Sequence, residues 1–136
     1  MAYFAPLKSP RGSVGVTVLN GKIHAIGGRG VDKVTVTTHE AYDPASGKWT
    51  ELAPLPRARD HLAVVAGGGR IHAVGGRLDA SSQNTDFNDI YNPSTNTWQV
   101  GPPLPTARSG IAGVLYQDKI FIAGGECRDK KTLSGI

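Results

Sequence analysis

Arginine recurs in this sequence at a regular spacing that suits the binding of an anionic ligand. Five arginines fall into two series whose members are 48 or 49 residues apart, namely Arg11, Arg59 and Arg108, and then Arg29 and Arg77. A guanidinium group presents a planar fork of donors that matches a carboxylate. The arginines therefore predict a site for an acidic peptide or an anionic small molecule. His61, two residues after Arg59, is predicted to line it.

A structural role is the alternative interpretation of the same residues. The surrounding segments also carry acids, which are Asp32, Asp60, Asp79, Asp86, Glu126 and Asp129. In this alternative, Arg11, Arg59 and Arg108 hold loops together by bonding to carbonyl groups or to these acids. Arg29 and Arg77 are the better ligand candidates, because Glu126, 49 residues after Arg77, stands at the third occurrence of their position.

The histidines and the single cysteine predict no further site. His24 and His72 are 48 residues apart and correspond to Phe121, so we expect them to pack, whereas His39 is expected to be exposed. The sequence contains no HExxH, CxxC or GxSxG pattern. We therefore predict no metal, no cofactor and no catalytic residue, and the protein is not expected to be an enzyme.

Charge and apolar composition argue against nucleic acid and membranes as partners. The net charge of +4 includes one tight basic cluster, at residues 128–131, so we do not expect nucleic-acid binding. Apolar runs reach only four or five residues, far below the ~20 that cross a membrane. Residues 1–6 do not resemble a signal peptide, and Cys127 has no partner for a disulfide, which favours a cytoplasmic location.

The elements that position the arginines repeat with the same period. Gly-Gly doublets occur at residues 27–28, 75–76 and 124–125, and each arginine of the first series lies 16 residues before one. Tyr42 and Tyr91 are 49 residues apart, and each lies seven residues before a tryptophan, Trp49 or Trp98. Landmarks in fixed order at one period indicate a repeat protein.

Each repeat predicts four short strands. Alternating apolar residues and turn signals place them at 14–19, 22–26, 33–42 and 49–52 in the first unit, and at 62–66, 70–74, 87–91 and 98–100 in the second. The third unit has strands at 111–116 and 119–123. Asn20-Gly21 between the first two strands is a strong hairpin signal.

The Gly-Gly, Tyr and Trp landmarks resemble the kelch repeat. The resemblance implies an all-β fold of kelch-type, four-stranded antiparallel β-propeller blades, incomplete within one chain. The units span about residues 5–52, 53–101 and 102–136, with residues 1–4 as a partial fourth strand. In kelch blades the glycines let the backbone bend beside the next blade, and the Tyr and Trp pack between strands.

Four antiparallel strands bring the loop before the first strand and the loop after the second to one face. Both arginine series lie in these loops, and kelch propellers commonly bind partners on this face, at the mouth of the central channel. The sequence therefore predicts an interaction scaffold that binds a protein or peptide partner. The alternative is a carbohydrate-active enzyme, such as a sugar-acid epimerase, that uses the same face.

A propeller needs roughly four to eight blades, and this chain supplies fewer than three. Two hypotheses follow. The chain belongs to a longer kelch protein, or two chains form a homodimer that closes a six-bladed ring. In the second case the end of one chain shares a blade with residues 1–5 of the other.

Overall fold

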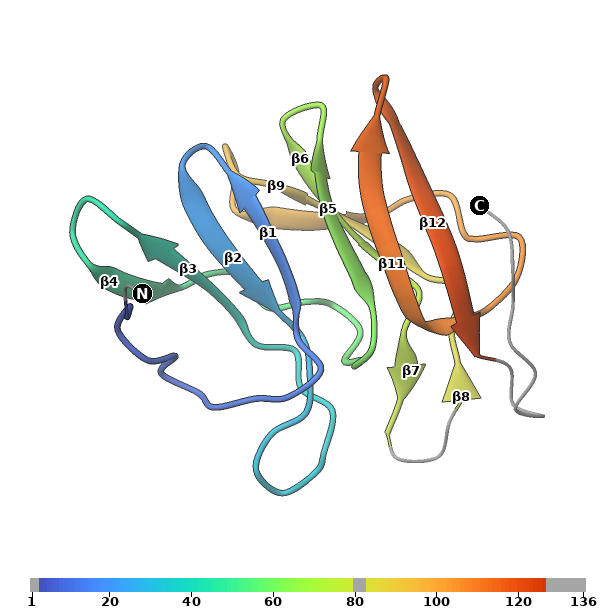
Figure 1. The fold of residues 1–136 in the computed structure, drawn as a ribbon, viewed down its shortest axis with the longest axis horizontal. Helices are drawn as coiled ribbons and strands as arrows, with labels where there is room; N and C mark the ends of the chain where they lie inside the picture. The colour runs from blue at the N-terminus through green and yellow to red at the C-terminus, as the bar shows by residue number, and fades with distance from the viewer. Residues whose placement is uncertain (1–2, 80–82, 127–136) are drawn as a thin grey trace.

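The computed structural model describes residues 3–79 and 83–126, and every regular element in them is a strand (Figure 1). Cys127 and the basic cluster at 128–131 lie outside these ranges. The described residues contain no helix that could cross a membrane.

The first sheet is a four-stranded antiparallel blade. Its strands follow chain order: β1 (Gly15–Leu19), β2 (Lys22–Ile26), β3 (His39–Asp43) and β4 (Lys48–Glu51). Asn20 and Gly21 form the predicted hairpin, and both have positive φ angles, as a tight two-residue turn requires. The aromatic landmarks face one another across the strands, because Ile23 pairs with Tyr42 and Tyr42 with Trp49.

The second sheet repeats this arrangement. It consists of β5 (Ala63–Gly67), β6 (Arg70–Val74), β9 (Asn88–Asn92) and β10 (Thr97–Val100), with Ile71 paired to Tyr91 and Tyr91 to Trp98. A short hairpin, β7 (Arg77–Leu78) and β8 (Gln83–Asn84), lies between β6 and β9. The third unit contributes the hairpin of β11 (Ser109–Tyr116) and β12 (Lys119–Glu126).

The strands agree with the sequence prediction within a few residues, with three differences. The third strand of the first unit begins at His39 instead of residue 33, because the preceding segment turns back on the glycine doublet: Val36 N–H donates to Gly28 O. The β7–β8 hairpin was not predicted. Tyr3 and Phe4 belong to no strand, and Phe4 instead packs against the Tyr42 ring at 5.2 Å.

The core lies between neighbouring blades. The main cluster joins Leu19 and Ile26 of the first blade to Val64, Ile71 and Tyr91 of the second. A smaller cluster of Ala63, Val74 and Ile122 joins the second blade to β12. Each blade therefore buries its apolar faces mainly against its neighbours, as expected for repeat units.

The two outermost faces lack such a neighbour in this chain. Val16 of β1 is 57% exposed, whereas its repeat equivalent Val64 is 9% exposed against the first blade. On the other side, Val114 of β11 is 59% exposed, whereas its equivalent Val65 is 5% exposed. The difference arises from position, since the side chains themselves are alike.

Candidate binding face

Both arginine series lie at one end of the blades. Figure 1 shows the segment after β2 and the β7–β8 hairpin at the end opposite the β1–β2, β5–β6 and β11–β12 turns. Backbone bridges hold the two kinds of loop together, because Gly12 pairs with Arg29 and Asp60 pairs with Arg77. The loop before each first strand therefore fixes the residue that follows each glycine doublet.

The glycine doublets bring these loops against the next blade. Gly28 N–H donates to Arg59 O at 3.0 Å, and Gly76 N–H donates to Arg108 O at 2.9 Å. Both glycines have φ near +100°, a conformation that L side chains rarely adopt. Arg29 and Arg77 follow these bends directly, so the bend positions them at the boundary between blades.

Asp60 connects Arg29 and Arg77. Its carboxylate is fully buried and lies 3.2 Å from Arg29 Nε through Oδ2 and 2.9 Å from Arg77 Nε through Oδ1. The arginine side chains are 23% and 20% exposed. One buried acid therefore holds two arginines from successive blades at the surface, with one positive charge in excess.

His61 completes this cluster. Its Nδ1–H donates to Asp60 Oδ1 at 2.5 Å, and its Nε2 lies 3.3 Å from Ser13 Oγ. Ser13, His61 and Gly110 all have positive φ angles. Backbone hydrogen bonds connect them from one unit to the next, because His61 N–H donates to Ser13 O and Gly110 N–H donates to His61 O. His61 thus occupies a bend that each unit contains, and it is 34% exposed.

Arg11 and Arg59 lie inside their own blades. Arg11 donates to Gly27 O at 2.6 Å and Thr38 O at 2.9 Å and pairs with Glu40 at 2.6 Å. Arg59 donates to Gly75 O and Ala73 O, both at 2.7 Å, and pairs with Asp89 at 2.7 Å. Both guanidinium groups are almost fully buried, and they bond to carbonyl oxygens and to an acid of their own blade.

Burial lowers the pKa of Arg59, and the Asp89 carboxylate opposes that shift. Arg57 adds a second contact to the same carboxylate at 2.5 Å and lies 3.6 Å over the Phe87 ring. The buried arginine and the buried acid therefore depend on each other in the folded blade, because removing either partner would leave a buried, unpaired charge.

Arg108 differs from its two equivalents. It donates to Gly124 O at 3.0 Å, as Arg11 and Arg59 do to their first doublet glycine. It is only half-buried, and within residues 3–79 and 83–126 it has no acidic partner. The structure thus brings the side chains of Arg29, Arg77 and His61 together around Asp60. The guanidinium groups of Arg11 and Arg59 pair with other acids, and that of Arg108 bonds to Gly124 O.

Asp60 is the residue that sequence reasoning missed as the organiser of this face. It was one acid among six, and its repeat equivalents are Gly12 and Ser109, so the period gave it no weight. The sequence feature that could have identified Asp60 is its place directly before His61, in a loop predicted to lie on the same face as Arg29 and Arg77. In the part of the chain that the structure describes, no group of three His, Cys, Asp or Glu residues could hold a metal.

The comparisons with known proteins agree with this architecture. The model of the kelch motif matches residues 10–56 and 58–105, so the chain belongs to the kelch-repeat family. The chain is also similar to the solved structure of YjhT, with a TM-score of 0.75 and 17% identity over 86% of this chain and 44% of that one. At this identity the likeness shows the fold alone. The chain spans less than half the length of that protein's chain, and no curated protein matches the sequence.

Proposed function

We propose that this protein is a protein-interaction module that binds an acidic peptide through Arg29, Arg77 and His61. Kelch repeats commonly mediate protein interaction, which supports this class of function. The observation that carries the finer proposal is the pair of arginines, each about one-fifth exposed, on one buried carboxylate.

The hydrogen bonds of these arginines leave donors for a ligand. Arg77 uses Nε for Asp60, and its two terminal nitrogens have no acceptor in the described part of the chain. Arg29 uses Nε and one terminal nitrogen for Lys33 O, while its other terminal nitrogen has no acceptor there. A carboxylate bound by these nitrogens would receive charge-assisted hydrogen bonds, which are stronger than neutral ones.

The surface beside Arg29 has room for a peptide. A shallow depression of about 290 Å³ is lined by Pro10, Arg11, Gly12, Gly30 and Val31 together with Arg29. The side chain of Arg11 is only 1% exposed there. Apolar contacts there would hold the peptide chain while the arginines hold its acidic side chain.

The test must avoid a buried unpaired charge. Replacing both arginines alone would leave Asp60 buried without a cation and would destabilise the fold. We therefore compare Asp60→Asn with the triple variant Asp60→Asn, Arg29→Gln and Arg77→Gln, neither of which carries that charge. The probe is dye-labelled hexaglutamate, with hexaglutamine as the neutral control, followed by fluorescence anisotropy.

We expect the triple variant to bind hexaglutamate at least about tenfold more weakly than Asp60→Asn, because charge-assisted hydrogen bonds contribute roughly 1.5–3 kcal/mol each. Equal affinity of the two variants would overturn the proposal. Turnover of a panel of sugar acids that requires the same arginines would favour the carbohydrate-active alternative.

We also propose that further blades cover the two open faces. A second copy of the chain and a longer polypeptide are the two sources. The exposed residues of the two open faces support this proposal. Their repeat equivalents, such as Val64 for Val16 and Val65 for Val114, are buried between the blades of this chain.

A further inference from the structure

A cavity lies beside the arginine cluster, between the segment before β1 and the loop from β2 to β3. It has a volume of about 400 Å³, and we call it the Thr38 cavity after one of the residues that line it. It adjoins the depression beside Arg29, because both are lined by Pro10, Arg11, Gly30 and Val31. A peptide held by Arg29 can therefore extend a neighbouring side chain into the Thr38 cavity.

In the second unit a phenyl ring stands at the position of Thr38. Gly27 N–H donates to Thr38 O, and Gly75 N–H donates to Phe87 O, so Thr38 and Phe87 are repeat equivalents. The Cζ atom of Arg57 lies 3.6 Å over the centre of the Phe87 ring, and that of Arg59 lies 5.5 Å from it. The ring is therefore packed between the two arginines and its own strand.

The first unit has smaller side chains at two of these three positions. Ser9 and Thr38 stand where the second unit has Arg57 and Phe87, whereas Arg11 is the equivalent of Arg59. Ser9, Arg11 and Thr38 all line the Thr38 cavity. The cavity is thus the space that a phenyl ring and a guanidinium group occupy in the next blade. An apolar cavity of about 150 Å³ already binds benzene, so a ring has ample room.

The walls of the Thr38 cavity suit an uncharged ring. Their apolar part comes from Pro10, Val31 and Val36. Their charges are balanced, because Lys8 and Arg11 stand with Asp32 in the wall and Arg11 is paired with the buried Glu40. Asp32 Oδ1 also accepts a hydrogen bond from Val34 N–H at 3.2 Å. The excess positive charge lies outside the cavity, at Arg29 and Arg77, and this is where an acid would bind.

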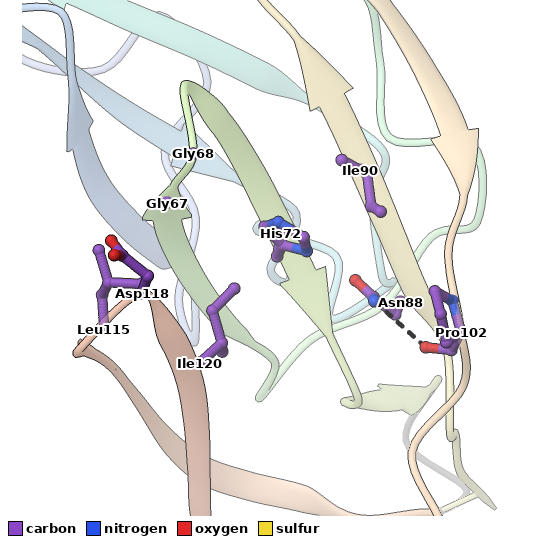
Figure 2. A pocket seen from close by; sticks show the side chains of 9 residues that line it. All are labelled: Gly67, Gly68, His72, Asn88, Ile90, Pro102, Leu115, Asp118 and Ile120. Carbon is purple, nitrogen blue, oxygen red and sulfur yellow. Dashed lines mark hydrogen bonds between the residues drawn. The ribbon is translucent and has the colours of Figure 1, made fainter.

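A cavity of similar size elsewhere in the protein does not suit the same ligand. It has a volume of about 390 Å³ and lies between the second blade and the β11–β12 hairpin, where Asn88 Nδ2 donates to Pro102 O (Figure 2). Among the described residues that line it, none is an arginine or a lysine, and Asp118 is one of them. An acidic peptide would gain no charge-assisted hydrogen bond there.

We infer that the Thr38 cavity binds the phenyl ring of a phenylalanine that stands next to an acidic residue in the partner peptide. The inference rests on the proposed function, because the acidic residue is held by Arg29 while the ring enters the cavity. It adds a requirement that the arginines alone do not set. The peptide must carry an aromatic residue as well as an acid, and the ring replaces the packing that Phe87 supplies in the second unit.

The test uses the full 136-residue chain and three dye-labelled peptides, EEEFEEE, EEELEEE and EEEAEEE, with binding followed by fluorescence anisotropy. We expect EEEFEEE to bind at least about tenfold more tightly than EEEAEEE, because the phenyl ring leaves water for the cavity. Equal affinity for these two peptides, no binding of EEEFEEE, or equal affinity for EEEFEEE and EEELEEE would overturn the inference. Hexaglutamate binding that requires Arg29 and Arg77 would still stand in that case, so the two proposals fail separately.

Filling the cavity locates the ring. We expect Thr38→Phe, which copies Phe87, to bind EEEFEEE and EEEAEEE equally, with the affinity that the wild type has for EEEAEEE. Thr50→Phe, at an exposed position of β4, is the matched control and should keep the preference for EEEFEEE.

A second variant guards against a folding defect. If Thr38→Phe melts below the wild type, Ser9→Arg combined with Thr38→Phe takes its place, because it rebuilds the Arg57–Phe87 pair of the second unit. A preference for EEEFEEE that persists in the filled cavity would show that the ring binds elsewhere. Loss of self-association in the filled variant, without a change in peptide binding, would assign the cavity to a second copy. Either result refutes the inference.

Discussion

At the scale of single residues, His24 and His39 of the first blade contact each other beside Tyr91 of the second blade. His39 is fully buried, although the sequence predicted an exposed side chain, because its strand begins there and turns it toward the second blade. Its Nδ1 lies 3.1 Å from Ala53 O, which can only accept, so Nδ1 carries the hydrogen. The Nε2 atom then accepts from His24 Nδ1–H at 2.9 Å.

This arrangement makes stability depend on pH. Burial lowers the pKa of His39 from 6.5 to about 4 and also lowers the pKa of His24. Between pH 6.5 and 4 the unfolded chain therefore binds a proton at His39 that the folded chain does not. As the pH falls from 6.5 to 4, this proton should lower the free energy of unfolding by about 3 kcal/mol. Above pH 6.5 this loss of stability is absent.

The variant His39→Asn isolates this contribution, since Asn88 is the natural equivalent and donates to Pro102 O in the same way. We expect urea denaturation of His39→Asn to show a weaker loss of stability between pH 6.5 and 4 than the wild type. An unchanged slope in the variant would contradict the assignment.

At the scale of elements, the glycine doublet after each second strand determines how the blades meet. A Cβ on Gly28 would lie 2.7 Å from Gly12 O, and one on Gly76 would lie 2.8 Å from Asp60 O. These contacts involve backbone atoms that cannot move aside without breaking the bridges that hold Arg29 and Arg77.

We therefore expect Gly28→Val to lower the free energy of unfolding by roughly 2–4 kcal/mol, from backbone strain and overpacking together. The control is Gly68→Ala in the β5–β6 turn, where φ is also positive but no atom lies within 4 Å of the new Cβ. It should cost about 1 kcal/mol. Thermal melting of the two variants measures the difference, and a melting temperature of Gly28→Val equal to that of Gly68→Ala would refute the steric argument.

At the scale of the whole molecule, the two open faces could cover each other in a pair of chains only if their side chains pack without overlap. Between the first two blades Gly15 lies against Val64, and between the second blade and the third unit Gly113 lies against Val65 and Ala63. Each contact thus contains one glycine, and a Cβ on Gly15 would lie only 2.1 Å from Val64 Cγ2. Two copies docked in the same register would oppose Ala112 to Val16, with no glycine.

If two chains close a ring in this register, relief of that overlap should strengthen it. We expect Ala112→Gly to raise the association constant at least about tenfold, since overpacking costs typically 1–3 kcal/mol. Sedimentation equilibrium measures the change, with Ala45→Gly in the exposed β3–β4 turn as the control. An association constant unaffected by Ala112→Gly would show that the two faces do not meet in this way.

The period, the class of fold and nearly all the strands could be predicted from the sequence, because the Gly-Gly, Tyr and Trp landmarks reflect local backbone and packing needs that recur from blade to blade. The sequence also placed both arginine series in loops at one end. The exposure of each arginine side chain could not be predicted in this way, because it depends on the tertiary fold. The burial of Arg11 and Arg59 against acids 29 or 30 residues away, and the gathering of Arg29 and Arg77 around Asp60, depend on contacts between distant segments. The repeat period does not predict side-chain pairs between blades when one position carries a different residue in each unit. The position of Asp60 is an example, because the other units have Gly12 and Ser109 there.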